Sequence, residues 1–385
     1  MKRIALILIL ICSISSVVAQ KGKVAVALNL VETGNLAKAM EAVNKATEHE
    51  KSKDWAKTYY AKGKVLQAIH DANNPEFNKF SENPLIEAFD NYKKAMKMDE
   101  EKGRLQSQID LNLIFMVNQF VNKGIEEFNG DDFAKSLEYF EYAMEIGNMP
   151  VFEGSVDTAI IYNAALAANN ANNYDKAIKY FTRAKDMNYG EANIYLLLRN
   201  AYLAKQDSLN AINTLKEGLE VYPDNADLLI QIINYYLVAG DNQVTLDYLN
   251  RAKESDQENP IFYFVEGTVY ENIKQPEKAT DSYKTSIELD PEYFDPHFNL
   301  GVYHFNNAKD IYDYANTLKD FDEYEKEKTR GDEELRKTLP YMEQAHKIKP
   351  EDILTLDTLK TVYYRLQMID KHDETLKKIE ELKNK

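Results

Sequence analysis

Cysteine is nearly absent from this sequence: among 385 residues the only one is Cys12. Glycine and proline are also scarce, with 14 and 10 residues. A collagen-like or low-complexity chain would need far more glycine and proline, and a disulfide-stabilised scaffold would need several cysteines. Hydrophobic residues make up 44% of the chain, which is enough for a core. The fold must therefore be held together by side-chain packing.

Positive charge is in short supply. Lysine and arginine number 47 against 63 aspartates and glutamates, so the formal net charge is −16. Nucleic acids and anionic membrane surfaces attract basic proteins. The excess of negative charge argues against both as main partners, and no nucleic-acid partner is predicted.

Sequence motifs that carry catalytic chemistry are missing as well. The sequence contains no His-Glu-x-x-His, Gly-x-Ser-x-Gly, Walker A or Gly-x-Gly-x-x-Gly pattern. His297 and His304 are seven residues apart, and two helical turns would separate them by about 10 Å, too far for one metal ion. We therefore expect a protein that is not an enzyme and has no catalytic residues, metal ligands or cofactors.

The first residues predict export. Lys2 and Arg3 precede an apolar run over 4–14, and Ala19 ends a stretch of small or permissive residues. These features are typical of a secretory signal peptide, here over 1–19, and the apolar run is shorter than the ~20 residues that span a bilayer. Removing it takes away two positive charges, so −16 becomes −18, and leaves no integral membrane segment.

Sites for N-linked glycosylation are absent too, although asparagine is frequent: no Asn-x-Ser/Thr sequence occurs. This absence mildly favours a bacterial envelope over a eukaryotic secretory route. We expect an exported protein in the periplasm, or associated with the outer membrane, of a Gram-negative bacterium. An extracellular location is a weaker alternative.

A period of 34 residues runs through the centre of the chain. Small, large and small residues recur in that order, beginning with Ala177, Phe181 and Ala184. Small residues at intervals of seven, with a large apolar residue between them, place two helices close together. The following trios are Ala211, Leu215 and Gly218; Thr245, Leu249 and Ala252; and Ala279, Tyr283 and Ser286.

These residues resemble the tetratricopeptide repeat, a family with a 34-residue helix-turn-helix repeat. The family has Gly or Ala at repeat position 8, Tyr at 11, Ala at 20, an aromatic residue at 24 and Pro at 32. Gly267, Tyr270, Ala279, Tyr283 and Pro291 match this pattern. The resemblance implies an all-α fold, an α-solenoid or tetratricopeptide superhelix of about nine helix-turn-helix repeats, in which each repeat covers the apolar face of its neighbour.

The repeat phase is interrupted twice and divides the sequence into regions. Asn83 and Pro84 end the first interruption, as an N-cap and a first-turn proline. The predicted regions are a signal peptide over 1–19, N-terminal repeats over 20–150 with a loop insertion near 70–83, four contiguous repeats over 151–292, a repeat over 293–350 with a helical insertion near 305–337, and a C-terminal repeat or cap over 351–385.

The second insertion adds 25 residues that are rich in charge and tyrosine. We expect both helices of its repeat to be lengthened, with the turn between them at Gly331. Pro340 then either starts the second helix or kinks it. A solvated packing spur and a docking element for a partner are both consistent with this composition.

The first helix of each repeat lines the concave groove in this family, so the resemblance also assigns binding residues. They mix asparagine with aliphatic and aromatic side chains, and Asn118 and Asn122 occupy matching places upstream. An amide both donates and accepts, so it can bind the backbone of an extended peptide of any sequence. Solvation of an open groove, or bonds to neighbouring helices, would explain the same asparagines. The predicted groove residues are Tyr162, Asn163, Leu196, Asn200, Ile230, Gln231, Asn234, Phe264, Thr268, Phe298 and Asn299.

The function that follows is a non-enzymatic scaffold for protein–protein interaction. It would bind a protein or an extended peptide in its groove, as part of a cell-envelope assembly. The alternative is a protein that binds carbohydrate or cell-wall fragments, since tyrosine and phenylalanine in a polar groove also suit sugars. Aromatic rings exposed toward the groove would favour this alternative. The oligomeric state is left open.

Overall fold

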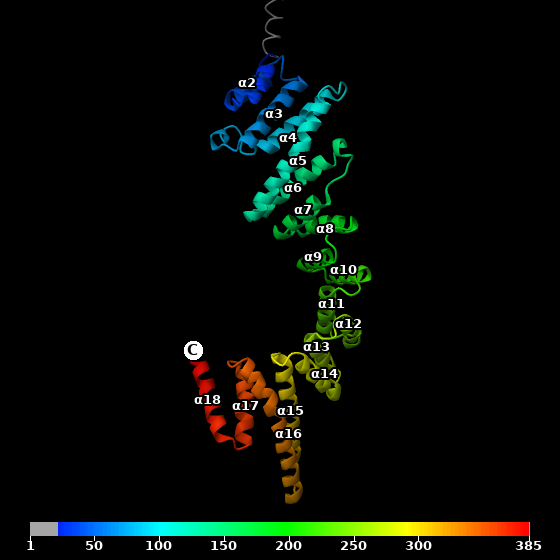
Figure 1. Ribbon diagram of the computed structural model, residues 1–385, viewed down its shortest axis with the longest axis vertical. Coiled ribbons are helices and arrows are strands. Elements are labelled where there is room, and N and C mark those ends of the chain that lie inside the picture. The colour runs from blue at the N-terminus through cyan, green and yellow to red at the C-terminus, as the bar shows by residue number, and fades with distance from the viewer. Residues whose placement is uncertain (1–21, 385) are drawn as a thin grey trace, which may run out of the picture. The chain divides into compact units, whose positions relative to one another are not determined.

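The computed structural model describes residues 22–384 of the protein (Figure 1). The predicted signal peptide lies outside this part. Within it the regular secondary structure is helical, without strands, which confirms the all-α fold. The helices are residues 22–32, α2 (Leu36–Glu48), α3 (Ala56–Ala72), η1 (Pro75–Phe77), α4 (Pro84–Asp99), α5 (Gln106–Asn129), α6 (Phe133–Gly147), η2 (Pro150–Phe152), α7 (Thr158–Asn170), α8 (Tyr174–Asp186), α9 (Asn193–Ala204), α10 (Ser208–Val221), α11 (Ala226–Ala239), α12 (Asn242–Ser255), α13 (Pro260–Asn272), α14 (Pro276–Leu289), α15 (Phe294–Ala315), α16 (Phe321–Ile348), α17 (Ile353–Arg365) and α18 (Ile369–Lys383).

The chain divides into two compact parts after Ser208. We call residues 22–208 the N-terminal body and residues 209–384 the C-terminal body. The division falls at the start of α10, inside the region 151–292 for which the sequence predicts contiguous repeats. Each body is therefore described by itself.

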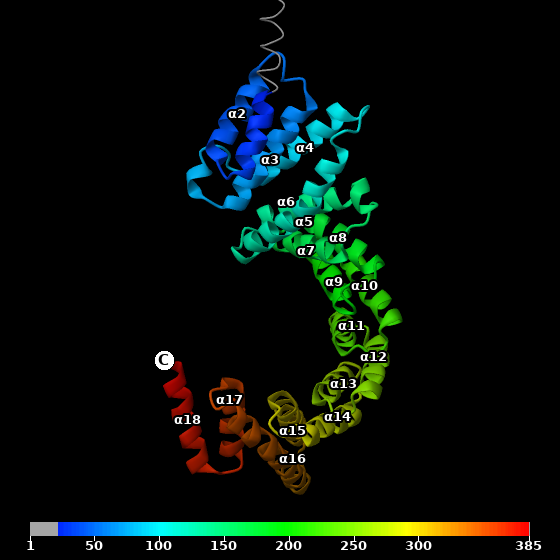
Figure 2. The same ribbon diagram turned by 45° about the horizontal axis from the view of Figure 1, so that its top comes forward.

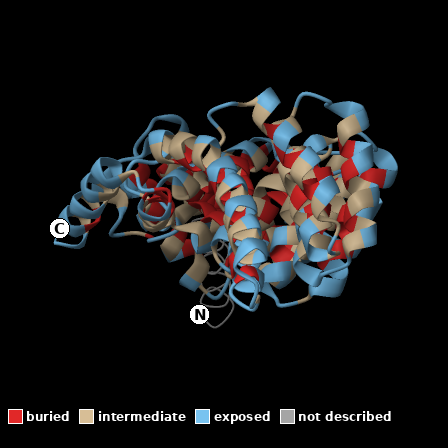
Figure 3. Cartoon of the chain, turned by 90° about the horizontal axis from the view of Figure 1, so that it is seen from below, coloured by how far each residue is buried: buried red, intermediate tan, exposed pale blue. Residues whose placement is uncertain are grey.

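Both bodies are built from helix pairs, and the small residues of the repeat lie where the two helices of a pair pack closely together. The alanines that recur in the second helices, such as Ala177 and Ala279, are buried. In Figure 3 buried positions lie along one side of many helices and exposed positions along the other. This pattern is expected for amphipathic helices that pack in layers. Asn83 and Pro84 begin α4 as its N-cap and first residue, as the sequence predicts.

A glycine in the first helix meets a large side chain of the second. A Cβ on Gly63 would lie 2.6 Å from the Tyr92 ring, and one on Gly124 would lie 2.9 Å from the Phe140 ring. A Cβ atom essentially never comes this close to a non-bonded atom, so the helices can approach this closely only with glycine there. We call this arrangement the glycine contact. It recurs at Gly267 against Tyr283 and at Gly301 against Met342.

The insertion near 305–337 forms a long antiparallel helix pair, α15 and α16, seen in two views in Figures 1 and 2. The expected turn at Gly331 is wrong. The chain turns at 316–320, where the Asp320 side chain caps α16 by accepting from the Glu323 amide at 2.9 Å. Gly331 lies inside α16, and the Tyr312 ring occupies the space where a side chain at this position would be. Pro340 is also inside α16 rather than at its start.

Part of this pair, extending into the last turn of α15, belongs to the core of the C-terminal body. Tyr312 and Leu335 pack with Val362 and Leu366 from the α17 region. Past Ala315 the turn and the first turn of α16, which we call the tip, are mostly exposed, and Phe321 is 72% exposed. The packing role therefore applies to the part of the pair that contacts the α17 region, while a docking role for the tip stays a prediction.

Replacing Gly331 with alanine should lower the unfolding free energy by about 1–3 kcal/mol, because the new Cβ would lie 2.7 Å from the Tyr312 ring. Helix propensity alone predicts the opposite sign, a gain of about 0.5–1 kcal/mol. Urea unfolding distinguishes these two expectations. Lys326→Ala, at an exposed position on the same helix, is the control. A Gly331→Ala protein more stable than the wild type would show that Tyr312 does not require this glycine.

Candidate functional site

A hollow of about 410 Å³ opens on the N-terminal body between α3 and α5, the first helices of consecutive pairs. Asn118 and Asn122, which the resemblance places on the groove, lie in its lining. Amides and apolar groups predominate there. The full lining is Val31, Lys64, Gln67, Ala68, Asp71, Asn112, Phe115, Asn118, Gln119 and Asn122.

Hydrogen bonds hold the floor of this hollow. Tyr92 Oη donates to Gln67 Oε1 at 2.8 Å, and Gln67 Nε2 donates to Gln119 Oε1 at 2.8 Å. Gln119 Nε2 in turn donates to Asp71. Burial raises the pKa of Tyr92, so its hydroxyl stays protonated and keeps its role as donor. The amides of α3 and α5 are thus oriented before any ligand arrives.

Beside the hollow, α5 exposes large apolar side chains. Leu111 is 60% exposed and Phe115 65% exposed, and Ile114 next to Phe115 is exposed as well. Residues four apart share one helix face, so Leu111 and Phe115 form a continuous apolar strip. We call Leu111, Ile114 and Phe115 the α5 strip. It was missed from the sequence, although the apolar run LNLIFMV over 111–117 is richer than a single buried stripe requires.

The predicted groove residues in the rest of the N-terminal body lie on α7 and α9. Tyr162 packs its ring 6.0 Å from Phe181 and 5.2 Å from Tyr189, between centroids. Asn163 and Leu196 are half-buried, and Asn200 is exposed. The Asn200 Oδ1 accepts from Arg199 at 2.9 Å. Of this group, Asn200 is the residue most open to a partner.

On α11 of the C-terminal body, Asn234 is exposed, while Ile230 and Gln231 are half-buried. Tyr235 and Val238 on the same helix are also exposed. Asn200 and Asn234 fall in different bodies. An asparagine ladder that joins them therefore stays a prediction.

Four further predicted groove residues take part in packing within the C-terminal body. Tyr283 Oη donates to Glu271 at 2.8 Å and accepts from Asn299 Nδ2 at 3.1 Å. Burial is the main cause that raises the pKa of Tyr283, which keeps the hydroxyl protonated. Asn299 thus forms a hydrogen bond to a neighbouring helix. This is one of the two structural explanations given above for the asparagines, the other being solvation of an open groove. The remaining contacts are Thr268 Oγ1 at 3.4 Å from Tyr283 Oη, Phe264 against Tyr283 and Tyr293, and Phe298 stacked on Phe294.

The two histidines seven residues apart have separate partners. His297 Nε2 lies 3.0 Å from the Pro291 carbonyl oxygen, and His304 Nδ1 lies 2.7 Å from Glu334. Burial lowers the pKa of His297, which favours a neutral ring that donates to the carbonyl. Over residues 22–384, no group of three or more His, Cys, Asp or Glu side chains is placed to hold a metal ion.

Comparison with known proteins supports the repeat family. Residues 158–190 and 261–293 match the family model of the tetratricopeptide repeat. These matches cover α7–α8 in one body and α13–α14 in the other. Proteins with this repeat are generally non-catalytic scaffolds for protein–protein interaction. No curated protein matches the sequence.

Several solved structures are similar to this chain. The C-terminal part of a TPR repeat-containing protein from Cytophaga hutchinsonii is 16% identical, covering 68% of this chain and 95% of that one, with a TM-score of 0.45. A TPR repeats protein from Bacteroides fragilis is 24% identical, covering 64% and 98%, with a TM-score of 0.31. YrrB, a TPR protein with an unusual peptide-binding site, is 14% identical, covering 53% and 95%, with a TM-score of 0.36.

Proposed function

We propose that the protein is a non-enzymatic scaffold that binds a segment of a partner protein on the α3–α5 surface of its N-terminal body. The observation that carries this proposal is the α5 strip, whose Leu111 and Phe115 are exposed beside an amide-lined hollow. Exposed apolar clusters with polar rims mark interaction sites. The partner's apolar side chains would cover the strip.

The amides of the hollow supply the second half of the recognition. Asn118 and Asn122 are exposed on the same helix as the strip, and the glutamines below them are already oriented by Tyr92. Exposed amides can pair with a peptide backbone irrespective of its sequence. Because the glutamines are held in place before binding, little ordering entropy is lost there.

Carbohydrate binding in the predicted central groove is less well supported. It needs aromatic rings exposed toward the groove, whereas Tyr162 packs on Phe181 and Phe264 packs on Tyr283. Aromatic rings packed in this way stabilise the helix pairs and are not exposed for stacking on a sugar.

The location that suits this role is the envelope of a Gram-negative bacterium, either in the periplasm or at the outer membrane. The pattern over residues 1–19 supports this proposal. Among residues 22–384, no helix combines the length and the apolar character needed to cross a membrane. Fractionation of cells that produce the protein, followed by N-terminal sequencing, tests both the location and the cleavage after Ala19.

A photocrosslinking amino acid at Asn118 tests the binding surface directly. We expect a covalent adduct of a distinct protein in envelope preparations, because Asn118 lies in the hollow next to the strip. The matched position is Glu138, exposed on the second helix α6, where no such adduct should form. Equal labelling at both positions, or none at Asn118, would contradict the proposal.

A further inference from the structure

A second hollow in the N-terminal body lies at the insertion that interrupts the repeat. It measures about 330 Å³ and is enclosed by the end of α3, residues 73–83, the start of α4 and the sides of α5 and α6. We call it the insertion pocket. None of its lining residues lines the α3–α5 hollow. The two surfaces can therefore be tested independently.

The insertion has its own internal order. Asn74 Oδ1 accepts from the Glu76 amide at 3.0 Å and starts η1. Ser81 Oγ donates to Glu87 at 2.7 Å and accepts from the Asn83 amide at 3.1 Å, which ties the loop to α4. Bonds of this kind give the pocket a defined wall before a ligand enters.

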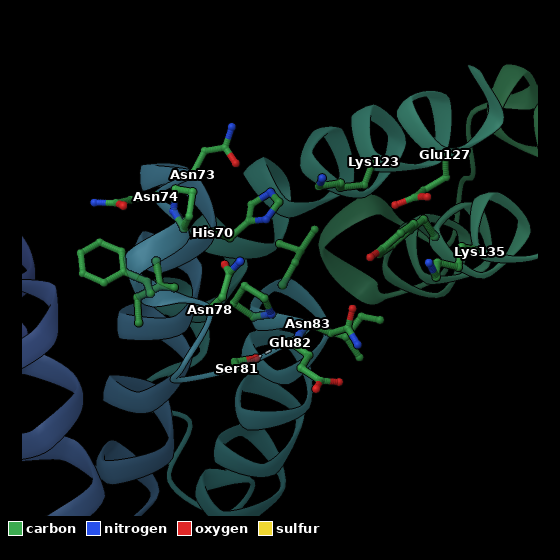
Figure 4. A pocket seen from close by; sticks show the side chains of 17 residues that line it. His70, Asn73, Asn74, Asn78, Ser81, Glu82, Asn83, Lys123, Glu127 and Lys135 are labelled. Atoms are coloured by element: carbon green, nitrogen blue, oxygen red, sulfur yellow. Dashed lines mark hydrogen bonds between the residues drawn. The ribbon is translucent and has the colours of Figure 1, made fainter. Parts of the chain in front are cut away.

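The insertion pocket is rich in groups that both donate and accept. Asn78 and Asn83 are exposed residues of its lining, and His70 on α3 also lines it. Burial lowers the pKa of His70, so near neutral pH its ring offers one donor and one acceptor. In Figure 4 Asn73, Asn74 and Asn78 lie on one side and side chains of α5 and α6 on the other, with Asn83 below and between them.

The charges of this pocket balance. Its two lysines are Lys123 and Lys135, and its two carboxylates are Glu82 and Glu127. Each lysine is also paired outside the lining, Lys123 with Glu126 at 2.7 Å and Lys135 with Asp132 at 2.9 Å. An anion would find its cations already paired with carboxylates, and over residues 22–384 no cluster of His, Cys, Asp or Glu side chains is placed to hold a metal cation. A neutral ligand is the best match.

We propose that the insertion pocket binds a neutral, hydroxyl-rich ligand, a carbohydrate. Hydroxyl groups both donate and accept, which matches the amides of Asn78 and Asn83 and the neutral imidazole of His70. Pro75, Pro84 and Ile86 add apolar surface for the C–H faces of a sugar ring. The volume is at the lower end of the range for ligand sites, about 300–1,000 Å³, so a small saccharide or the end of a longer chain would fit. This site goes beyond the proposed scaffold function and does not depend on it.

Saturation-transfer difference NMR on the protein tests this proposal. The probes are glucose, galactose, N-acetylglucosamine, maltose, cellobiose and chitobiose, each at millimolar concentration, with inorganic phosphate as the anionic probe. We expect saturation transfer to at least one saccharide. Asn78→Ala combined with Asn83→Ala should weaken that binding at least about tenfold, since each amide loses a hydrogen bond worth a factor of several.

The control is Asn213→Ala, an exposed asparagine on α10, which should leave saccharide binding unchanged. The thermal midpoints of all three proteins should agree, because neither Asn78 nor Asn83 uses its side chain to cap a helix. The proposal is overturned if no saccharide in the panel shows transfer, if the double variant binds as well as the wild type, or if phosphate occupies the site in place of sugar.

Discussion

Tyr283→Ala should destabilise the C-terminal body by about 3–5 kcal/mol, the range for removing a large buried ring. Tyr283 is fully buried, faces Gly267 and packs against Phe264. Its removal opens a cavity between α13 and α14 that rigid helices cannot close, because neither Gly267 nor its neighbours can fill the space. The hydroxyl also joins α13 to α15 through Glu271 and Asn299.

Tyr283→Phe separates the ring from the hydroxyl. It keeps the packing and loses the hydrogen bonds, so its cost should be only about 1 kcal/mol. Hydrogen exchange of the α13 and α14 amides, together with urea unfolding, measures both variants. Tyr314→Ala is the control, since that ring is 56% exposed and its loss should stay within about 0.5 kcal/mol. Equal costs for the Ala and Phe variants would mean that the hydroxyl, not the ring, stabilises the pair.

The double substitution Leu111→Ser with Phe115→Ser should weaken capture of the partner by about a factor of 100 or more. Complete burial of a Leu or Phe side chain contributes about 1.5–3 kcal/mol, and two of them lie side by side on the α5 strip, so a loss of about 3 kcal/mol or more corresponds to a factor of about 100 or more. Both are more than half exposed in the free protein. Folding stability should therefore change little.

The measurement is quantitative capture of the protein identified by crosslinking at Asn118. Tyr364→Ser is the matched control, since it removes an aromatic ring that is 60% exposed on α17 of the C-terminal body. It should leave capture unchanged. If the double variant retains full capture while the crosslink persists, the amides rather than the strip would carry the affinity.

Local periodicity explains how far the fold could be predicted. The spacing of Ala177, Phe181 and Ala184 reports which residues of a second helix face the first, and all three are buried. Gly331 shows where such reasoning fails. Glycine commonly ends helices, but here a ring from α15 needs the space, and only the tertiary structure shows which side chain stands opposite.

The candidate site was harder to predict for a related reason. Repeat positions show which face of a first helix a residue occupies, and Asn118, Asn122 and Asn200 do lie on accessible surface. Repeat positions do not show which side chains of the neighbouring helix lie opposite that residue. Asn299 is half-buried and donates to Tyr283 because α15 packs next to that hydroxyl. The exposure of Phe115 likewise depends on which helix surfaces remain uncovered.

The glycine contact has a consequence for how this protein could change over evolution. Gly267 and Tyr283 are 16 residues apart, Gly63 and Tyr92 are 29 apart, and Gly301 and Met342 are 41 apart. Compared with the Gly267–Tyr283 pair, the other two pairs have 13 and 25 additional residues between the glycine and its partner, yet the contact is kept. Doubling the length of a flexible connection costs only about 0.6 kcal/mol in closure entropy. Each pair can therefore accept new chain between its helices and acquire a new surface, such as the insertion pocket, while its neighbours keep their fold.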